Sequence, residues 1–207
     1  MNEYRLTSIK QTKKGRFALF FDEKFYFSID EEILLKRHLK EDTIWSEEQI
    51  EDLKRLTDYN KAKEKAFQYL SIRQHSEKEL FEKLERNYDE HTAAEIIERL
   101  KELNLLNDEE FASSYYQQMI NRGKSIAEAR AKLLQKGISK DIIDYVTIEF
   151  QPSEEDTILQ LIQTKYRRKL MKENGKELVF AALARRGFRM SSIRNVLGKV
   201  DVEDYGE

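Results

Sequence analysis

The sequence contains no cysteine, one proline, seven glycines and three histidines among its 207 residues. Without cysteine the protein has no disulfide, no thiolate nucleophile and no cysteine-based zinc site. The three histidines, His38, His75 and His91, are not spaced as metal ligands, so we expect them at the surface or beside helix caps. Because glycine and proline are scarce, we expect few long irregular loops. These features predict a protein that holds neither a metal nor another cofactor.

Long apolar runs are also missing from the sequence. A membrane-spanning helix needs about eighteen or more consecutive apolar residues, and no such run occurs. The opening residues, Met1-Asn2-Glu3-Tyr4, do not begin a secretory segment. We therefore expect a soluble cytoplasmic protein with no membrane partner, long enough for one or two domains with a real core.

Charged residues make up 37% of the chain and are unevenly distributed. Residues 1–153 hold 26 basic and 30 acidic residues, a net charge of −4, whereas residues 154–200 hold 11 basic and 5 acidic residues, a net charge of +6. The last seven residues, 201–207, carry a net charge of −4. Such an asymmetry indicates an acidic or polyanionic partner at one end, although a solvated basic face explains the same charge equally well.

A helical unit recurs three times, about 50 residues apart. In each copy a short helix ends with a basic residue, then Gly or Asn, then a large apolar residue. The three ends are Arg86-Asn87-Tyr88, Lys136-Gly137-Ile138 and Arg186-Gly187-Phe188. A second apolar helix follows each of them. This self-similarity indicates stacked units that are each too small to bury their own apolar face, and such arrays form extended binding surfaces more often than enclosed active sites.

The first thirty residues differ from the rest. Leu6–Ile9, Phe17–Phe21 and Phe25–Phe27 are short runs of aromatic and branched residues, separated by polar segments. They predict a small antiparallel meander. Because an isolated meander is marginal in water, we expect its aromatic face, with Phe17, Phe20 and Phe25, to pack on the neighbouring helices.

Helix boundaries are marked by caps at both ends. Six segments have the spacing of a capping box: Ser28-x-x-Glu31, Ser46-x-x-Gln49, Ser76-x-x-Glu79, Thr92-x-x-Glu95, Asn107-x-x-Glu110 and Ser125-x-x-Glu128. At the other end of a helix, Gly137 and Gly187 occupy the position that favours a left-handed backbone, and Asn87 is the next-best residue there.

These patterns predict a mainly α protein of tandem three-helix repeats preceded by an N-terminal antiparallel β-meander. We place the meander and its helices in residues 1–60, the three repeats in residues 61–106, 107–152 and 153–200, and an acidic tail in residues 201–207.

Catalysis has little support in the sequence. Gly123-Lys124-Ser125 is similar to the end of a phosphate-binding loop, but Gln118 occupies the position of the required first glycine and no buried strand precedes it. We interpret the segment as a loop followed by a helix N-cap. Since the acidic side chains lie on charged helix faces, we predict no catalytic residue and no enzymatic activity.

The basic residues of the third repeat are the candidates for partner binding. Lys165, Arg168 and Lys172 follow one another at helical spacing, so we expect them on one side of the first helix of that repeat. The following helices add Arg185, Arg186, Arg189 and Arg194. Such groups contact phosphates or the carboxylates of a protein groove. Arg186 also has a structural alternative, because a cation in the last turn interacts favourably with the helix dipole.

Two motifs resemble those of the RecX family of recombinase regulators, and the resemblance covers residues 62–199. One motif lies in residues 66–80, and the other in residues 106–115 with a continuation at residues 136–138. The residues that carry the resemblance are Tyr69, Arg73, Asp108, Phe111, Ala112, Tyr115, Lys136 and Gly137. The chain departs from the family at Asn87, where the first repeat often has glycine, and this repeat is one residue short between Leu84 and Tyr88.

The resemblance implies a non-enzymatic protein that binds the RecA filament on DNA. It implies an elongated, curved array that lies in the helical groove of the filament, bridges protomers and inhibits ATP hydrolysis, strand exchange and co-protease activity. The expected setting is homologous recombination, DNA repair and the SOS response. We expect a monomer, and direct nucleic-acid contact would involve the third repeat.

Two alternatives stay open at this point. The third repeat could be a helix-turn-helix reader of duplex DNA, although its last helix, Ser191–Leu197, offers only Arg194 and Asn195 as base-reading side chains. The chain could also be a helical adaptor for another protein.

Overall fold

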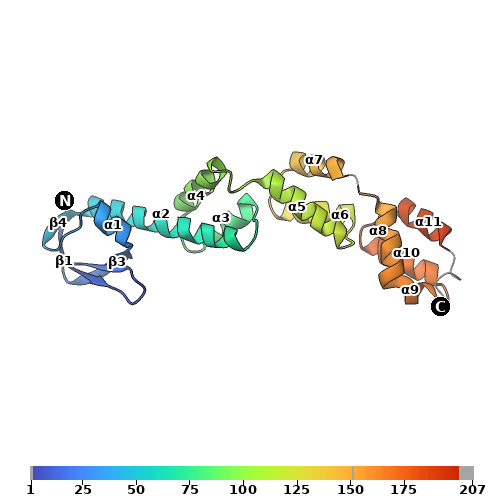
Figure 1. The fold of residues 1–207 in the computed structure, drawn as a ribbon, viewed down its shortest axis with the longest axis horizontal. Coiled ribbons are helices and arrows are strands. Elements are labelled where there is room, and N and C mark those ends of the chain that lie inside the picture. Colours follow the sequence, from blue (N-terminus) through green and yellow to red (C-terminus); the bar gives the residue numbers. More distant parts are fainter. Residues whose placement is uncertain (1, 151, 201–207) are drawn as a thin grey trace. The chain divides into compact units, whose positions relative to one another are not determined.

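A computed structural model of the chain describes residues 2–150 and 152–200 (Figure 1). These residues are mostly helical, with an antiparallel sheet at the N-terminal end. The contacts divide the chain into two compact units. Unit 1 contains the residues up to Arg73 together with Leu80–Leu103, and unit 2 contains Gln74–Glu79 and the residues from Asn104 onward. The predicted acidic tail, residues 201–207, lies outside the described residues.

The N-terminal sheet has four antiparallel strands in the order β3-β2-β1-β4. They are β1 (Glu3–Gln11), β2 (Phe17–Phe21), β3 (Lys24–Ile29) and β4 (Thr43–Ser46). The predicted meander of β1, β2 and β3 is therefore confirmed, whereas β4 was not predicted. Between β2 and β3, Asp22 and Glu23 have φ angles of 47° and 65°, which suit a tight two-residue hairpin turn.

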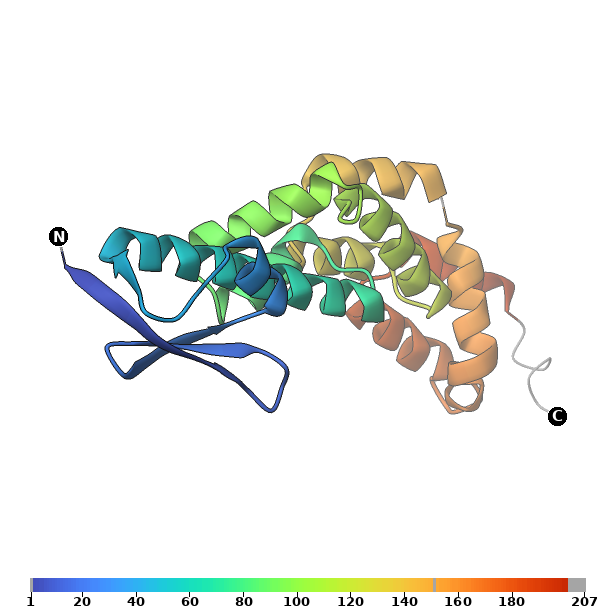
Figure 2. The same ribbon diagram turned by 60° about the vertical axis from the view of Figure 1, so that its left-hand side comes forward.

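Helix α1 (Glu31–Lys36) and the first half of α2 (Glu47–Ile72) cover one face of this sheet, as Figure 2 shows. The core between them contains Leu6, Leu19, Phe21, Phe27, Ile29, Ile33, Leu39, Ile50 and Leu53. Of the three aromatic residues predicted for this face, only Phe17 packs against the core, while Phe25 is 57% exposed. The prediction grouped Phe17 with Phe20, but residues three apart in a strand point to opposite faces.

Unit 1 continues with the rest of α2, most of α3 (Glu77–Glu85) and α4 (Glu90–Glu102). Buried residues follow the helical period, with Ala62 and Ala66 on α2 and Ile96, Ile97 and Leu100 on α4. Helix α2 runs without interruption through residue 60, where we had placed the end of the N-terminal segment. The sheet and the first three-helix segment therefore share one long helix.

Unit 2 continues after the start of α3 with a series of short helices. They are α5 (Asp108–Asn121), α6 (Ile126–Gln135), α7 (Lys140–Phe150), α8 (Glu154–Leu161), the π-helical turn η1 (Ile162–Tyr166), α9 (Arg167–Leu170), α10 (Gly175–Arg185) and α11 (Met190–Lys199). One apolar core lies among α5, α6 and α7, and a second among the elements from α8 to α11. The arrangement confirms the predicted class, which is mainly α with tandem three-helix segments after an antiparallel sheet.

Four of the six predicted helix caps are present. Ser46, Ser76, Asn107 and Ser125 each accept a hydrogen bond from a backbone N–H in the first turn of their helix. The other two predictions were wrong. Helix α1 begins after Asp30 while Ser28 belongs to β3, and α4 begins after Asp89 while Thr92 lies in its first turn. Aspartate caps a helix as well as serine does, and the N-caps of α1 and α4 are Asp30 and Asp89.

The ends of the repeated helices differ between the first copy and the other two. Gly137 and Gly187 have φ angles of 87° and 81°, which confirms the predicted left-handed caps. Asn87 is not left-handed, so that prediction was wrong. Because this repeat is one residue shorter, the amide of Tyr88 reaches the carbonyl of Leu84 four residues back, and the turn closes without a left-handed residue.

Candidate partner-binding surface

The seven basic residues predicted for partner binding all lie in unit 2. Six are exposed, namely Lys165, Arg168, Lys172, Arg185, Arg189 and Arg194, and Arg186 is half-buried. Within the part of the chain that the structure describes, none of the six exposed residues forms an ion pair with a carboxylate. Their positive charge is therefore directed to solvent and available to a partner.

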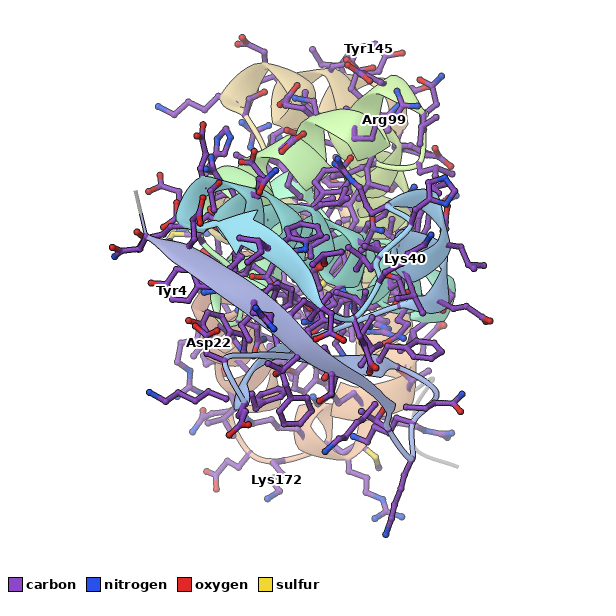
Figure 3. All side chains as sticks on the ribbon, turned by 90° about the vertical axis from the view of Figure 1, so that its left-hand side faces the viewer. Tyr4, Asp22, Lys40, Arg99, Tyr145 and Lys172 are labelled. Carbon is purple, nitrogen blue, oxygen red and sulfur yellow. The ribbon has the colours of Figure 1, made fainter. Side chains whose placement is uncertain are left out.

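Three of these residues do not lie on one unbroken α-helix as we expected. Lys165 lies in the π-helical turn η1, Arg168 lies in α9, and Lys172 lies in the turn that follows Leu170 and projects from the ribbon (Figure 3). The expectation assumed an unbroken α-helix, but the wider hydrogen-bonded ring of a π turn changes the direction of later side chains. π-helical turns inside helices occur frequently at functional sites.

Arg186 is held by contacts within unit 2. Its Nη2 donates to the carbonyl oxygen of Gly123 over 2.6 Å, and its Nη1 lies 3.4 Å from the hydroxyl oxygen of Tyr166. Its guanidinium carbon also lies 5.7 Å from the centre of the Phe188 ring. These contacts give Arg186 a structural role and leave less of the guanidinium for a partner.

The backbone next to Arg186 takes part in a second contact, which we call a serine joint. Ser125 caps α6 by accepting a hydrogen bond from the amide of Glu128 over 3.1 Å, and its hydroxyl donates to the carbonyl oxygen of Arg186 over 2.7 Å. The serine side chain is fully buried. One hydroxyl thus satisfies an amide at the start of α6 and a carbonyl at the end of α10.

The same joint occurs a second time in unit 2. Ser76 accepts a hydrogen bond from the amide of Glu79 over 3.2 Å and donates to the carbonyl oxygen of Lys136 over 2.7 Å. In both joints the accepting carbonyl belongs to the basic residue that precedes the left-handed glycine. The sequence pattern revealed the caps, but the second bond joins residues about 60 positions apart and has no local signal.

Several residues that carry the family resemblance meet around Lys136. Its ammonium group pairs with the carboxylate of Glu79, and the side chains of both residues are 20% exposed. The same ammonium nitrogen lies 5.7 Å from the centre of the Phe111 ring and 4.9 Å from that of Tyr115. The two rings stack with an interplanar angle of 16°. The motif therefore builds a cation held between a carboxylate and two aromatic rings.

The other motif residues have local roles. Asp108 accepts a hydrogen bond from the amide of Glu77 over 2.9 Å, and Ala112 is fully buried in the core of α5, α6 and α7. In unit 1, the amide of Arg73 donates to the carbonyl of Tyr69 at the end of α2, and the ring of Tyr69 carries two lysine ammonium groups at 4.5 and 5.2 Å. These contacts hold helix ends and neighbouring side chains in position.

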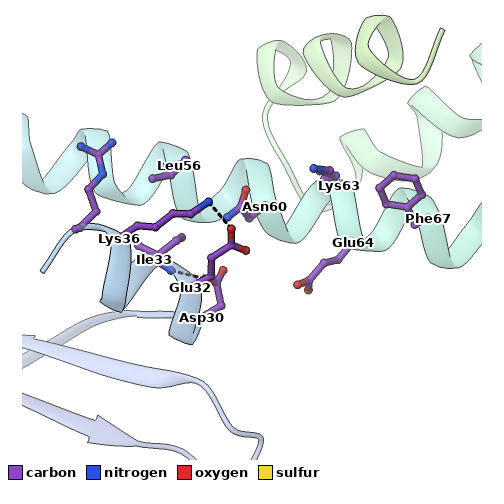
Figure 4. Close-up of a pocket in the computed structure, with 10 residues that line it drawn as sticks. Asp30, Glu32, Ile33, Lys36, Leu56, Asn60, Lys63, Glu64 and Phe67 are labelled. Carbon is purple, nitrogen blue, oxygen red and sulfur yellow. Dashed lines mark hydrogen bonds and ion pairs between the residues drawn. The ribbon is translucent and has the colours of Figure 1, made fainter. Parts of the chain in front are cut away.

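A groove of about 760 Å³ lies between α1 and α2 in unit 1 (Figure 4). Three of its charged side chains have partners: Asp30 accepts from the amide of Ile33 over 2.8 Å, and Lys36 donates to Glu32 over 2.5 Å. The hydrogen bond and the charge of Glu32 raise the pKa of Lys36. Among the described residues there is no cluster of three or more metal-ligating side chains, and no helix is long and apolar enough to cross a membrane.

Comparisons with known proteins bear on the whole chain. Three family models match: the regulatory protein RecX N-terminal domain over residues 4–44, the first three-helix domain of RecX over residues 62–100, and the second over residues 107–146. Among solved structures, a crystal structure of regulatory protein RecX covers 95% of this chain and 100% of its own, with a TM-score of 0.69 and 27% identity. RecX from Lactobacillus salivarius covers 70% of this chain and 97% of its own, with a TM-score of 0.61 and 25% identity.

Two proteins named regulatory protein RecX show the relationship in sequence. The one from Listeria welshimeri is 34% identical over 171 residues, which are 82% of this chain and 62% of the other. The one from Clostridium perfringens is 30% identical over 211 residues, which span 98% of this chain and 99% of the other. With this identity over nearly the full length of both chains, and with matches to the N-terminal and three-helix domains, the chain belongs to the RecX family of regulatory proteins.

Proposed function

We propose that this protein binds the RecA filament on DNA and inhibits its ATP hydrolysis, strand exchange and co-protease activity. Membership in a family of regulatory proteins supports this proposal. The structural observation that carries it is the set of six exposed basic residues of the third repeat, which have no ion-pair partner in the described chain. We place the protein in the cytoplasm, as a monomer that acts without catalysis.

The contact that we propose is electrostatic. Exposed guanidinium and ammonium groups that form no internal ion pair can pair with carboxylates or phosphates of a partner, and charge-assisted hydrogen bonds are stronger than neutral ones. We therefore propose that acidic side chains of the filament, or phosphates of its DNA, bind the third repeat at Lys165, Arg168, Lys172, Arg185, Arg189 and Arg194. Arg186 supports this surface from within, because its guanidinium binds Gly123 and Tyr166.

The experiment is an ATPase titration of RecA on single-stranded DNA with increasing amounts of this protein. We expect inhibition at substoichiometric amounts, because a bound array that bridges protomers affects more than one of them. Inhibition that requires one molecule for each RecA protomer would exclude bridging. A rate that stays unchanged at equimolar protein would refute the proposed function itself.

A further inference from the structure

The sheet of unit 1 has an outer face, opposite the one that α1 and α2 cover. Antiparallel partners point to the same face, and Phe20 pairs with Phe25 while Arg5 pairs with Ile44. Phe25 and Ile44 are 57% and 55% exposed. Lys10 belongs to the same face, since its ammonium nitrogen lies 4.9 Å from the centre of the Phe20 ring. We call Arg5, Lys10, Phe20, Phe25 and Ile44 the outer sheet face.

The segment that contributes Arg5, Lys10 and Phe20 to this face is strongly basic. Residues 4–21 contain five basic residues, Arg5, Lys10, Lys13, Lys14 and Arg16, and no acidic residue. Residues 30–60, which contain α1, β4 and the first half of α2, hold five basic and ten acidic residues. The charge of the whole chain hides this separation, because the net charges of the two segments cancel.

Two carboxylates that contact β1 accept hydrogen bonds from its backbone. Asp22 accepts a hydrogen bond from the amide of Arg5 over 3.0 Å, and Glu41 accepts one from the amide of Ile9 over 2.7 Å. Neither carboxylate forms an ion pair with a basic residue of this segment. Lys10, Lys13 and Lys14 are exposed and are thus as available to a partner as the cations of the third repeat. Arg16 is half-buried, and its Nη2 donates to the carbonyl oxygen of Ser28 over 3.3 Å.

We propose that the outer sheet face and the β1–β2 hairpin bind single-stranded nucleic acid. Unstacked bases would lie against the rings of Phe25 and Phe20, which contact each other edge to face at 5.9 Å. The phosphates would contact Lys10, Lys13 and Lys14. Exposed rings beside a positively charged track are the general means by which proteins bind single strands without sequence preference.

The exposed ring of Phe25 and the positive charge of the hairpin each exclude a simpler partner. A polyanion without rings would leave the exposed Phe25 unexplained, and an apolar protein surface would leave the concentration of positive charge unexplained. A duplex offers phosphates but keeps its bases stacked inside, so it cannot use the rings. The site lies in unit 1, whereas the filament contact proposed above lies in unit 2, and the two proposals are independent.

The test is fluorescence anisotropy of a labelled oligo(dT) of about 16 nucleotides, the upper end of the usual site size, with the full chain and no RecA. Phe25→Ala should weaken binding about 5- to 150-fold, the effect typical of removing one base–ring stack. The matched control is Tyr145→Ala in α7, because Tyr145 is 59% exposed and should leave the affinity unchanged. Circular dichroism should show the wild-type fold for both variants.

Charge reversal tests the binding of phosphates. Lys13→Glu combined with Lys14→Glu should lower the affinity and reduce the slope of log affinity against log salt by about 0.7 for each phosphate that the protein no longer neutralises. The proposal is overturned if the wild type does not bind oligo(dT) at low salt, or if Phe25→Ala binds it as tightly as the wild type does. If Phe25→Ala instead weakens only binding to a RecA filament, the outer sheet face is a protein-docking surface and the proposal is wrong.

Discussion

The serine joints make a quantitative prediction about stability. Replacing Ser125 with Ala removes the cap of α6, which typically stabilises a helix by about 1 kcal/mol. It also leaves the carbonyl oxygen of Arg186 without its 2.7 Å donor, and the absence of a hydrogen bond of this kind costs about a further 1 kcal/mol. We therefore expect Ser125→Ala to lower the free energy of unfolding by about 2 kcal/mol, or the melting temperature by about 4–8 °C.

The chain provides a matched control. Ser153 caps α8 by accepting from the amide of Asp156 over 3.1 Å, but it is exposed and donates no hydrogen bond within the described chain. Ser153→Ala should therefore cost only the cap, about 1 kcal/mol or less. Urea denaturation followed by circular dichroism measures both variants, and Ser76→Ala should behave like Ser125→Ala. If Ser125→Ala is no more destabilising than Ser153→Ala, the second hydrogen bond contributes nothing and our account of the joint is wrong.

Two further variants test the caps. Gly137→Ala should lose more than about 1–2 kcal/mol, because its φ is 87° and a Cβ there would lie 2.6 Å from that of Lys78. A Cβ at Gly198 would meet no atom within 4 Å, so Gly198→Ala should leave the free energy of unfolding unchanged or raise it in urea denaturation. An equal loss of stability in both variants would contradict the role of Gly137. Asp89→Ala should reduce stability more at pH 7 than at pH 3. Hydrogen bonds from the backbone and side chain of Thr92 lower the pKa of Asp89, so its contribution is present above the unfolded pKa of about 4 and is lost as the pH falls through the folded pKa. Equal losses in urea denaturation at both pH values would show that the ionised form gives no advantage.

Local signals in the sequence identified much of the fold. Short runs of aromatic and branched residues marked β1, β2 and β3, and the glycines at positions 137 and 187 marked the ends of two repeated helices. The failures also have physical causes. The start of α4 was misplaced because Thr92 and Asp89 are both suitable caps, and the π-helical turn was missed because it breaks the period of 3.6 residues on which helical patterns depend.

For the candidate site, the sequence predicted which residues are basic but not which contacts they form. The sequence showed that the third repeat is basic, but not that Arg186 would bind Gly123 while its neighbours remain without ion pairs. Contacts between residues about 60 positions apart leave no local pattern. The family resemblance included Lys136 among its motif residues but could not show what Lys136 contacts. The structure shows its ammonium group between the carboxylate of Glu79 and two aromatic rings.

The central claim, that the third repeat binds the RecA filament through its exposed cations, is tested most directly by charge reversal. The variant replaces Lys165, Arg168 and Arg189 with Glu, and the control replaces Lys40, Lys54 and Lys63, which are equally exposed in unit 1. Each exposed substitution should change stability by no more than about 0.5 kcal/mol, so both proteins should fold.

The measurement is the concentration of protein that halves RecA ATPase activity on single-stranded DNA, at low and at physiological salt. We predict a large increase for the third-repeat variant, little change for the unit 1 variant, and weaker inhibition by the wild type as salt shortens the electrostatic range to about 8 Å. Equal losses in the two variants would mean that overall charge, and not this surface, drives binding. Wild-type inhibition by a folded third-repeat variant would contradict the claim.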